Sequence, residues 1–118
     1  MPYELVVRGE FARGAGAAGS GELTNRRYRP GATFCGNDVT TVGALDKAHE
    51  LRTDIPSDAA LIGHDDASFA SLVCPQLTTI RHPAAEMGRP LLIECLCSGR
   101  DVQKAVHLRA EFGAGAFV

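Results

Sequence analysis

The sequence predicts an α/β domain in which short parallel strands are covered by helices. Short apolar runs typical of buried parallel strands alternate along the chain with segments of helical periodicity, and only short turns separate them. Strands and helices that alternate in this way form βαβ units, with the helices on the faces of a parallel sheet. The length of 118 residues is that of one small domain, so we expect a single hydrophobic core.

The first half of the chain contains two predicted strands, each followed by a predicted helix. Residues 3–8 are rich in β-branched and aromatic side chains, which predicts a strand. Residues 12–27 are expected to form a helix despite their glycines, and the apolar run 32–35 after a Pro-Gly turn predicts the second strand. A helix capped by Asn37 or Asp38 should follow. Its apolar residues recur every third position: Val39, Val42, Leu45, Ala48 and Leu51.

The second half continues the alternation. Residues 59–63 and 77–81 predict the third and fourth strands. A helix is expected within residues 83–98, and a returning strand is expected within residues 104–110. We therefore divide the chain into a core lobe over residues 3–82, this helix and the returning strand.

Charge and hydropathy argue against two classes of partner. The net charge of −2 is unlike the strongly basic balance of a domain that grips phosphate backbones, so we expect no direct nucleic-acid contact by this segment. No apolar run approaches the roughly 20 residues that a membrane-spanning helix needs, and the first residues do not resemble a secretion signal. We expect a cytoplasmic protein without a membrane contact.

The cysteines and the known catalytic motifs point away from metal and enzyme chemistry. The cysteines lack CxxC spacing and lie among apolar residues, which predicts reduced, mostly buried thiols and no metal site: Cys35, Cys74, Cys95 and Cys97. There is no GxSxG elbow and no HExxH pair. We therefore predict no catalytic residues, no cofactor and no enzymatic activity.

Residues 14–19 spell GxGxxG, and Asp38 follows about twenty residues later, as a dinucleotide site would require. In that motif the first glycine turns directly off the strand, whereas here four residues intervene after Gly9. A dinucleotide-binding enzyme therefore stays an outside alternative. The favoured interpretation is a helix of small residues packed closely on the sheet.

Polar side chains follow the second and third predicted strands. Asn37 and Asp65 could donate to and accept from neighbouring sugar hydroxyls, or they could merely cap turns, and the pattern alone slightly favours capping. Phe34 could stack on a ring or belong to the core. His64 and His82, each at a strand end, could bind a ligand or be satisfied boundary histidines.

Three stretches, taken together, resemble the LacI/GalR family of bacterial regulators. They read FCGNDVTTVGAL over residues 34–45, IPSDAALIGHDD over residues 55–66, and LTTIRHPAAEMG over residues 77–88. The resemblance implies a flavodoxin-like lobe, with three layers α/β/α, of a periplasmic-binding-protein-like sensor. In this family two such lobes hold a sugar or nucleobase-type effector between them, and a helix-turn-helix reads operator DNA.

The resemblance assigns roles to individual residues. Asn37 and Asp65 look like effector hydrogen-bonding residues, and Phe11 and Phe34 resemble ring-facing or pocket-wall positions. His82 occupies a polar pocket position that often carries another residue type. The expected partner is therefore a small-molecule effector, most simply a sugar.

The family likeness also implies a homodimer. The helix after Asn37 and the turn around Leu72 and Val73 would lie on the dimer face, with Val42 on that helix. An effector would favour the lobe arrangement that it contacts better, so that sensing makes or breaks no bond.

The sequence departs from the family in ways that suggest other interpretations. The chain contains no helix-turn-helix, and the helix from Ala84 would lack the sheet on which it normally packs. An exposed apolar stripe should result, formed by Met87, Leu91, Leu92 and Leu96. Pro90 should kink that helix, and His64 stands where an aromatic is usual. A truncated fragment that self-associates and a sugar-binding protein of a transporter are the alternatives.

Overall fold

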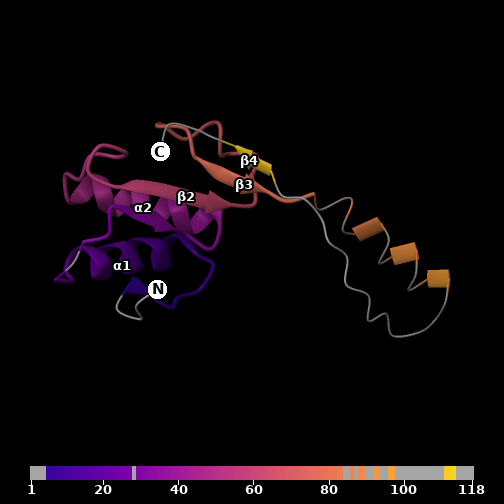
Figure 1. Cartoon of the computed structure of the whole chain (residues 1–118), viewed down its shortest axis with the longest axis horizontal. Helices are drawn as coiled ribbons and strands as arrows, with labels where there is room; N and C mark the ends of the chain where they lie inside the picture. The colour runs from indigo at the N-terminus through magenta and orange to yellow at the C-terminus, as the bar shows by residue number, and fades with distance from the viewer. Residues whose placement is uncertain are drawn as a thin grey trace.

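A computed structural model describes most of the chain, namely residues 5–27, 29–83, 86, 88–89, 92–93, 96–97 and 111–113. In chain order its elements are α1 (Arg13–Thr24), β1 (Ala32–Phe34), α2 (Asp38–Glu50), β2 (Ala60–His64), β3 (Thr79–Arg81) and β4 (Glu111–Gly113). From α1 to β3, these elements follow the order that the sequence predicts (Figure 1).

The strands form one sheet in the order β1-β2-β3-β4. β1 pairs with β2 in parallel, with Phe34 opposite Ile62, and β2 pairs with β3 in parallel, with His64 opposite Ile80. The predicted α/β fold with a parallel sheet is thus confirmed. β4 adds an antiparallel edge to β3 that the sequence did not predict, and the expected strand at residues 104–110 lies outside the described residues.

The strand predicted over residues 3–8 is wrong for its described part. Residues 5–8 pair with no strand of the described part of the chain and instead lie beside α1, where Val7 Cγ1 is 3.5 Å from the position that a Cβ would take at Gly19. β-branched side chains are enriched in strands because they suit a half-buried surface. Here helix α1 supplies the surface on which these side chains pack, so the strand-like pattern occurs without a strand.

Helices α1 and α2 approach each other at two glycines. A Cβ at Gly16 would lie 1.9 Å from the backbone oxygen of Thr40, and a Cβ at Gly43 would lie 1.8 Å from that of Arg13. Close packing of the small-residue helix was predicted correctly, but its partner is α2 rather than the sheet. The GxGxxG residues lie inside α1, so they form no phosphate-binding turn after a strand. This placement argues against the dinucleotide alternative.

Helix α2 covers the sheet with only part of the predicted stripe, in which Val42 packs against the core. Leu45 and Ala48 belong to the core, but Val39 and Leu51 are 39% and 46% exposed. α2 is enclosed by α1 on one side and the sheet on another, so its small and polar residues are buried as well. The core cluster comprises Cys35, Ala44, Leu45, Ala48, Ile55, Leu61, Ala70 and Leu77.

The described residues between Glu86 and Cys97 are helical, and Figure 1 shows them in orange, away from the sheet. Leu92 and Leu96 are 62% and 82% exposed, which confirms that part of the predicted apolar stripe. The other members of the stripe and Pro90 lie outside the described residues. Within the described part of the chain, no helix is long and apolar enough to cross a membrane.

The cysteines are less buried than predicted. Cys35 is buried, but Cys74 and Cys97 are exposed, and Cys95 lies outside the described residues. Cys74 follows the apolar pair Leu72 and Val73, of which Leu72 is itself 82% exposed, so an apolar sequence neighbourhood did not imply burial here.

We expect this difference to appear in alkylation. Burial raises the pKa of the Cys35 thiol, although a hydrogen bond with Thr41 opposes this effect. At mildly alkaline pH the Cys35 thiol should therefore stay protonated and shielded, while Cys74 and Cys97 react with iodoacetamide first. Peptide mass spectrometry over time checks this order. Equal labelling of Cys35 and Cys74 in the folded chain would contradict it.

Candidate functional site

The carboxyl ends of β1 and β2 lie at the same edge of the sheet, because the two strands are parallel neighbours. Asn37 follows β1 and caps α2, where its Oδ1 accepts a hydrogen bond from the Thr40 backbone N–H at 2.9 Å. The capping interpretation of Asn37 is thus confirmed. The cap uses only the side-chain oxygen, so the amide nitrogen can still donate to a ligand.

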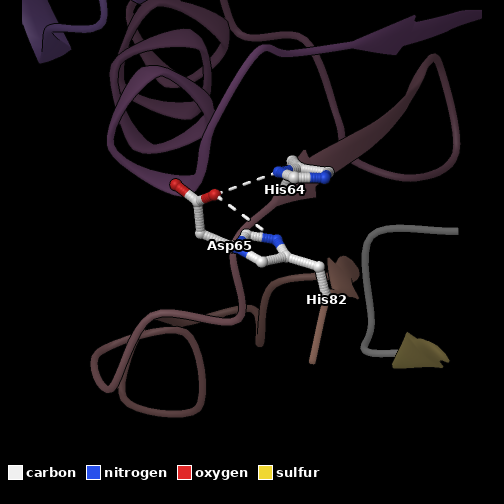
Figure 2. A group of neighbouring side chains, drawn as sticks. All are labelled: His64, Asp65 and His82. Atoms are coloured by element: carbon white, nitrogen blue, oxygen red, sulfur yellow. Dashed lines mark hydrogen bonds and ion pairs between the residues drawn. The ribbon is translucent and has the colours of Figure 1, made fainter. Parts of the chain in front are cut away.

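Asp65 follows β2 directly and is exposed. Its backbone N–H donates to the Ile80 carbonyl oxygen at 2.9 Å, while its φ of 112° turns the chain away from the strand. Its Oδ1 lies 3.0 Å from His64 Nδ1 and 3.9 Å from His82 Nδ1 (Figure 2). The structure therefore brings Asp65 and His82 together, and it adds His64 to them.

The two imidazole rings stack, with centroids 4.9 Å apart and planes inclined by 21°. His64 fits the interpretation of a satisfied boundary histidine, because Nδ1 has Asp65 as a partner. His82 does not. Its Nδ1 is buried and has no hydrogen-bond partner within the described residues.

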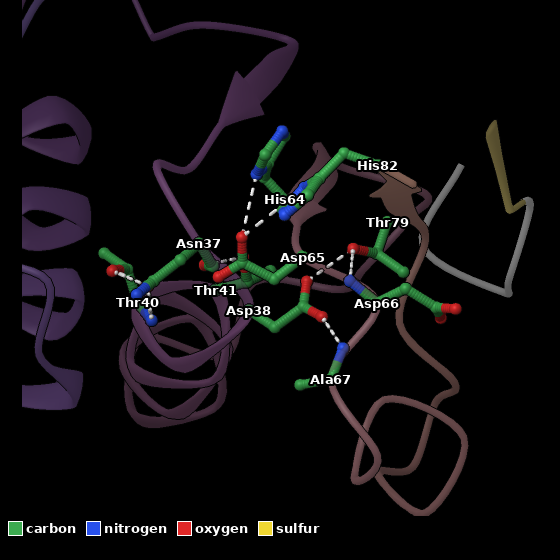
Figure 3. A network of polar contacts seen from close by, with 10 residues as sticks. All are labelled: Asn37, Asp38, Thr40, Thr41, His64, Asp65, Asp66, Ala67, Thr79 and His82. Atoms are coloured by element: carbon green, nitrogen blue, oxygen red, sulfur yellow. Dashed lines mark hydrogen bonds and ion pairs between the residues drawn. The ribbon is translucent and has the colours of Figure 1, made fainter. Parts of the chain in front are cut away.

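A buried carboxylate holds the turn that carries Asp65. Asp38 is 1% exposed, and its two oxygens accept from Thr79 Oγ1 at 2.6 Å and from the Ala67 backbone N–H at 2.7 Å (Figure 3). Thr79 Oγ1 in turn accepts from the Asp66 backbone N–H at 3.2 Å. The start of α2, the turn after β2 and β3 are thereby joined in one network.

The sequence predicted Asp38 as a possible helix cap or as part of a dinucleotide site, and this role was missed. Its partners lie 29 and 41 residues further along the chain, so no local pattern signals them. Gly63 leaves room for the Asp38 carboxylate, since a Cβ at Gly63 would lie 2.3 Å from Asp38 Oδ1. We regard Asp38 as a positioning residue for Asp65.

An apolar pocket of about 470 Å³ lies beside this edge. Both predicted pocket-wall residues line it, with Phe11 76% exposed and Phe34 60% exposed, so the core interpretation of Phe34 is wrong. Asn37, Asp65 and His82 do not line the pocket. The pocket and these polar residues are nevertheless neighbours, because Gly36, which lines the pocket, directly precedes Asn37 in the chain.

The three residues expected on a dimer face differ in exposure. Leu72 is 82% exposed, whereas Val42 and Val73 are partly buried and pack against the core. Leu72 therefore offers most of the apolar surface that this set could bury in a partner.

The sequence profile of the periplasmic binding protein-like domain matches residues 2–110. The chain belongs to this family. Among its relatives is the HTH-type transcriptional repressor PurR of Klebsiella pneumoniae, which is 30% identical over 111 residues, or 92% of this chain and 33% of the repressor. PurR of Serratia proteamaculans is 31% identical over 108 residues, or 89% of this chain and 32% of that protein. The chain thus spans about a third of the length of these relatives.

Solved structures agree with the sequence relatives. The transcriptional regulator CelR in complex with cellobiose has a TM-score of 0.87 and 25% identity, covering 100% of this chain and 37% of CelR. A LacI family regulator from Lactobacillus casei with bound glucose has a TM-score of 0.72 and 28% identity, covering 91% and 40%. The predicted resemblance to the effector-binding domain of LacI-type regulators is confirmed.

Proposed function

We propose that this chain binds a small-molecule effector, a sugar or a related compound, as part of a LacI-type transcription regulator. The observation that carries the proposal is the placement of Asn37 and Asp65 at the carboxyl ends of two neighbouring parallel strands, which is where ligands of open α/β sheets bind. The names of solved relatives support a sugar, since cellobiose and glucose are bound to two of them.

The chemistry of these side chains suits a polyhydroxylated ligand. The Asp65 carboxylate can accept from two adjacent hydroxyls, and the Asn37 amide nitrogen can donate to one. His82 adds a ring nitrogen beside Asp65. Phe11 and Phe34 offer exposed ring faces at the adjoining pocket, where the apolar face of a sugar ring can pack.

No step of this function makes or breaks a bond. An effector that contacts one arrangement of the protein better than another shifts the population toward that arrangement, by as much as its two affinities differ. In a full-length regulator this shift would change the affinity for DNA. Consistent with a sensor, the named relatives are transcriptional repressors.

The test is a ligand titration of the 118-residue chain, followed by NMR chemical shifts, with cellobiose, glucose, sucrose, ribose and nucleobases as probes. We expect one probe to shift signals of Asn37, Asp65 and Phe34 together. Asp65→Asn removes the charge and Asn37→Asp keeps the capping oxygen while removing the amide donor. Each should weaken binding by about tenfold or more, as loss of a charge-assisted or amide hydrogen bond does.

The matched control is Asp46→Asn, which alters an exposed carboxylate in α2 that pairs with Arg13. It should leave the affinity unchanged. If a probe binds the parent chain and both site variants equally well, Asn37 and Asp65 are not effector residues.

We further propose that the chain forms a homodimer through a face that includes Leu72. Its 82% exposure is large for a leucine side chain, and Val42 and Val73 would form the rim of the same face. Leu72→Glu should shift the sedimentation coefficient toward that of a monomer, because a charge in an apolar interface is costly. Leu51→Glu, at another exposed leucine, is the control. A dimer that survives Leu72→Glu unchanged would refute this assignment.

A further inference from the structure

The geometry points to a binding site for one divalent transition-metal ion, such as Zn²⁺, Ni²⁺ or Co²⁺, formed by His64, Asp65 and His82. Nothing in the effector proposal requires a metal, and the two proposals can fail separately. The argument rests on the donor set, the distances between donors, an unsatisfied buried nitrogen and the access to the cluster.

The donor set is two imidazoles and one carboxylate. Imidazole nitrogen suits zinc, nickel and copper, and two histidines with one carboxylate form a common metal-binding arrangement with open positions. The three residues come from the ends of two paired strands, since His64 ends β2, Asp65 follows it, and His82 follows β3. A hydrogen-bonded sheet edge thus sets the separation of their backbones.

The donor atoms already converge. The ring nitrogens and the carboxylate oxygen all lie within 4.8 Å of one another, with 3.0 Å between Asp65 Oδ1 and His64 Nδ1. Two ligands of one zinc ion, each about 2.0–2.2 Å from it, are about 3–4 Å apart. The 3.9 Å between Asp65 Oδ1 and His82 Nδ1 falls within that span. These distances allow one ion to be bound once the two imidazole rings rotate about their side-chain bonds.

His82 supplies an independent observation. Its Nδ1 is buried and has no hydrogen-bond partner in the described part of the chain, while Figure 2 shows it directed toward the Asp65 carboxylate. Buried polar atoms are nearly always paired, because an unpaired one costs about 1–3 kcal/mol. Coordination of an ion through Nδ1, with the ring proton on Nε2, would satisfy this atom.

Partial exposure favours the same use. The stacked rings are inclined by only 21°, so they rotate out of the stack when the nitrogen lone pairs, which lie in the ring planes, turn toward one ion. The side chains of His64, Asp65 and His82 are 34%, 46% and 33% exposed, so an ion can enter from solvent. Three protein ligands leave at least one coordination position open for water or for an oxygen of a bound molecule.

The experiment uses the untagged 118-residue chain with Cys74, Cys95 and Cys97 replaced by serine, so that these thiols do not bind the metal. Isothermal titration calorimetry with Zn²⁺ and Ni²⁺, at neutral to slightly alkaline pH and without any effector, should show one bound metal ion per chain. His64→Gln and His82→Gln should each weaken binding by about tenfold or more, since even changes beyond the direct ligands cost 10–100-fold. His49→Gln, at an exposed histidine of α2, should leave it unchanged.

A second readout avoids dependence on the folding of the variants. Paramagnetic Ni²⁺ or Co²⁺ added to the parent chain should broaden the NMR ring signals of His64 and His82 before those of His49. The proposal is overturned if no metal binds at one equivalent, if both glutamine variants bind as tightly as the parent, or if the signals of His49 broaden first.

Discussion

Gly43→Ala is expected to destabilise the chain by about 2–4 kcal/mol, a large share of the stability of a small domain. The new Cβ would lie 1.8 Å from the Arg13 carbonyl oxygen and 3.0 Å from the Ala17 backbone nitrogen. Both obstacles are backbone atoms of α1, so no side chain can rotate away and the two helices must separate. Urea denaturation followed by circular dichroism measures the loss.

Gly14→Ala is the matched control for this prediction. Gly14 also lies inside a helix, but a Cβ there would meet nothing within 4 Å. It should stabilise the chain by up to about 1 kcal/mol, because alanine loses less backbone entropy than glycine in a helix. Equal stability of Gly43→Ala and the parent would show that the close approach of α1 and α2 does not hold in solution.

Asp38→Ala is expected to cost about 3 kcal/mol or more and to loosen the turn that carries Asp65. Removal of the carboxylate leaves two donors without their acceptor in a buried place, the Thr79 hydroxyl and the Ala67 backbone N–H. Effector binding should weaken as well, although Asp38 is buried beneath the site and is not proposed to touch the ligand. Urea denaturation and hydrogen exchange at the Ala67 amide measure the two effects.

Asp46→Ala provides the comparison for Asp38→Ala. The Arg13 side-chain hydrogen bond lowers the pKa of the Asp46 carboxyl, so this pair stabilises the fold above the usual carboxyl pKa and loses its effect as the pH falls through the lowered value. The side chains of Arg13 and Asp46 are 64% and 40% exposed, so water screens the pair and its contribution is small. If Asp38→Ala is no more destabilising than Asp46→Ala, and the Ala67 amide stays protected, the network does not hold the turn.

Much of the architecture follows from local patterns in the sequence. The capping side chain of Asn37, the apolar runs that became β1 and β2, and the alternation of strands with helices all act over a few residues. Such signals depend only on residues that are near one another in the sequence. The likeness to LacI-type regulators could also be predicted from the sequence, because three motifs keep their order and spacing along the chain.

The incorrect predictions have a common cause, which is that burial depends on contacts between distant parts of the chain. Residues 5–8 carry a strand pattern but lie beside α1, and Phe34 and Cys74 are exposed despite apolar surroundings in the sequence. Burial depends on which elements meet in space, and β-propensity reports a suitable surface rather than a pairing partner.

The sequence by itself therefore determined the order of elements from α1 to β3, the cap of α2 and the family. Only the tertiary structure decided that Gly43 faces the backbone of α1, that Asp38 holds the turn after β2, and that His82 meets Asp65. Each of these contacts joins residues from different elements, and such contacts are set by sheet register and helix packing. Sheet register and helix packing are decided only when the whole chain folds around its core.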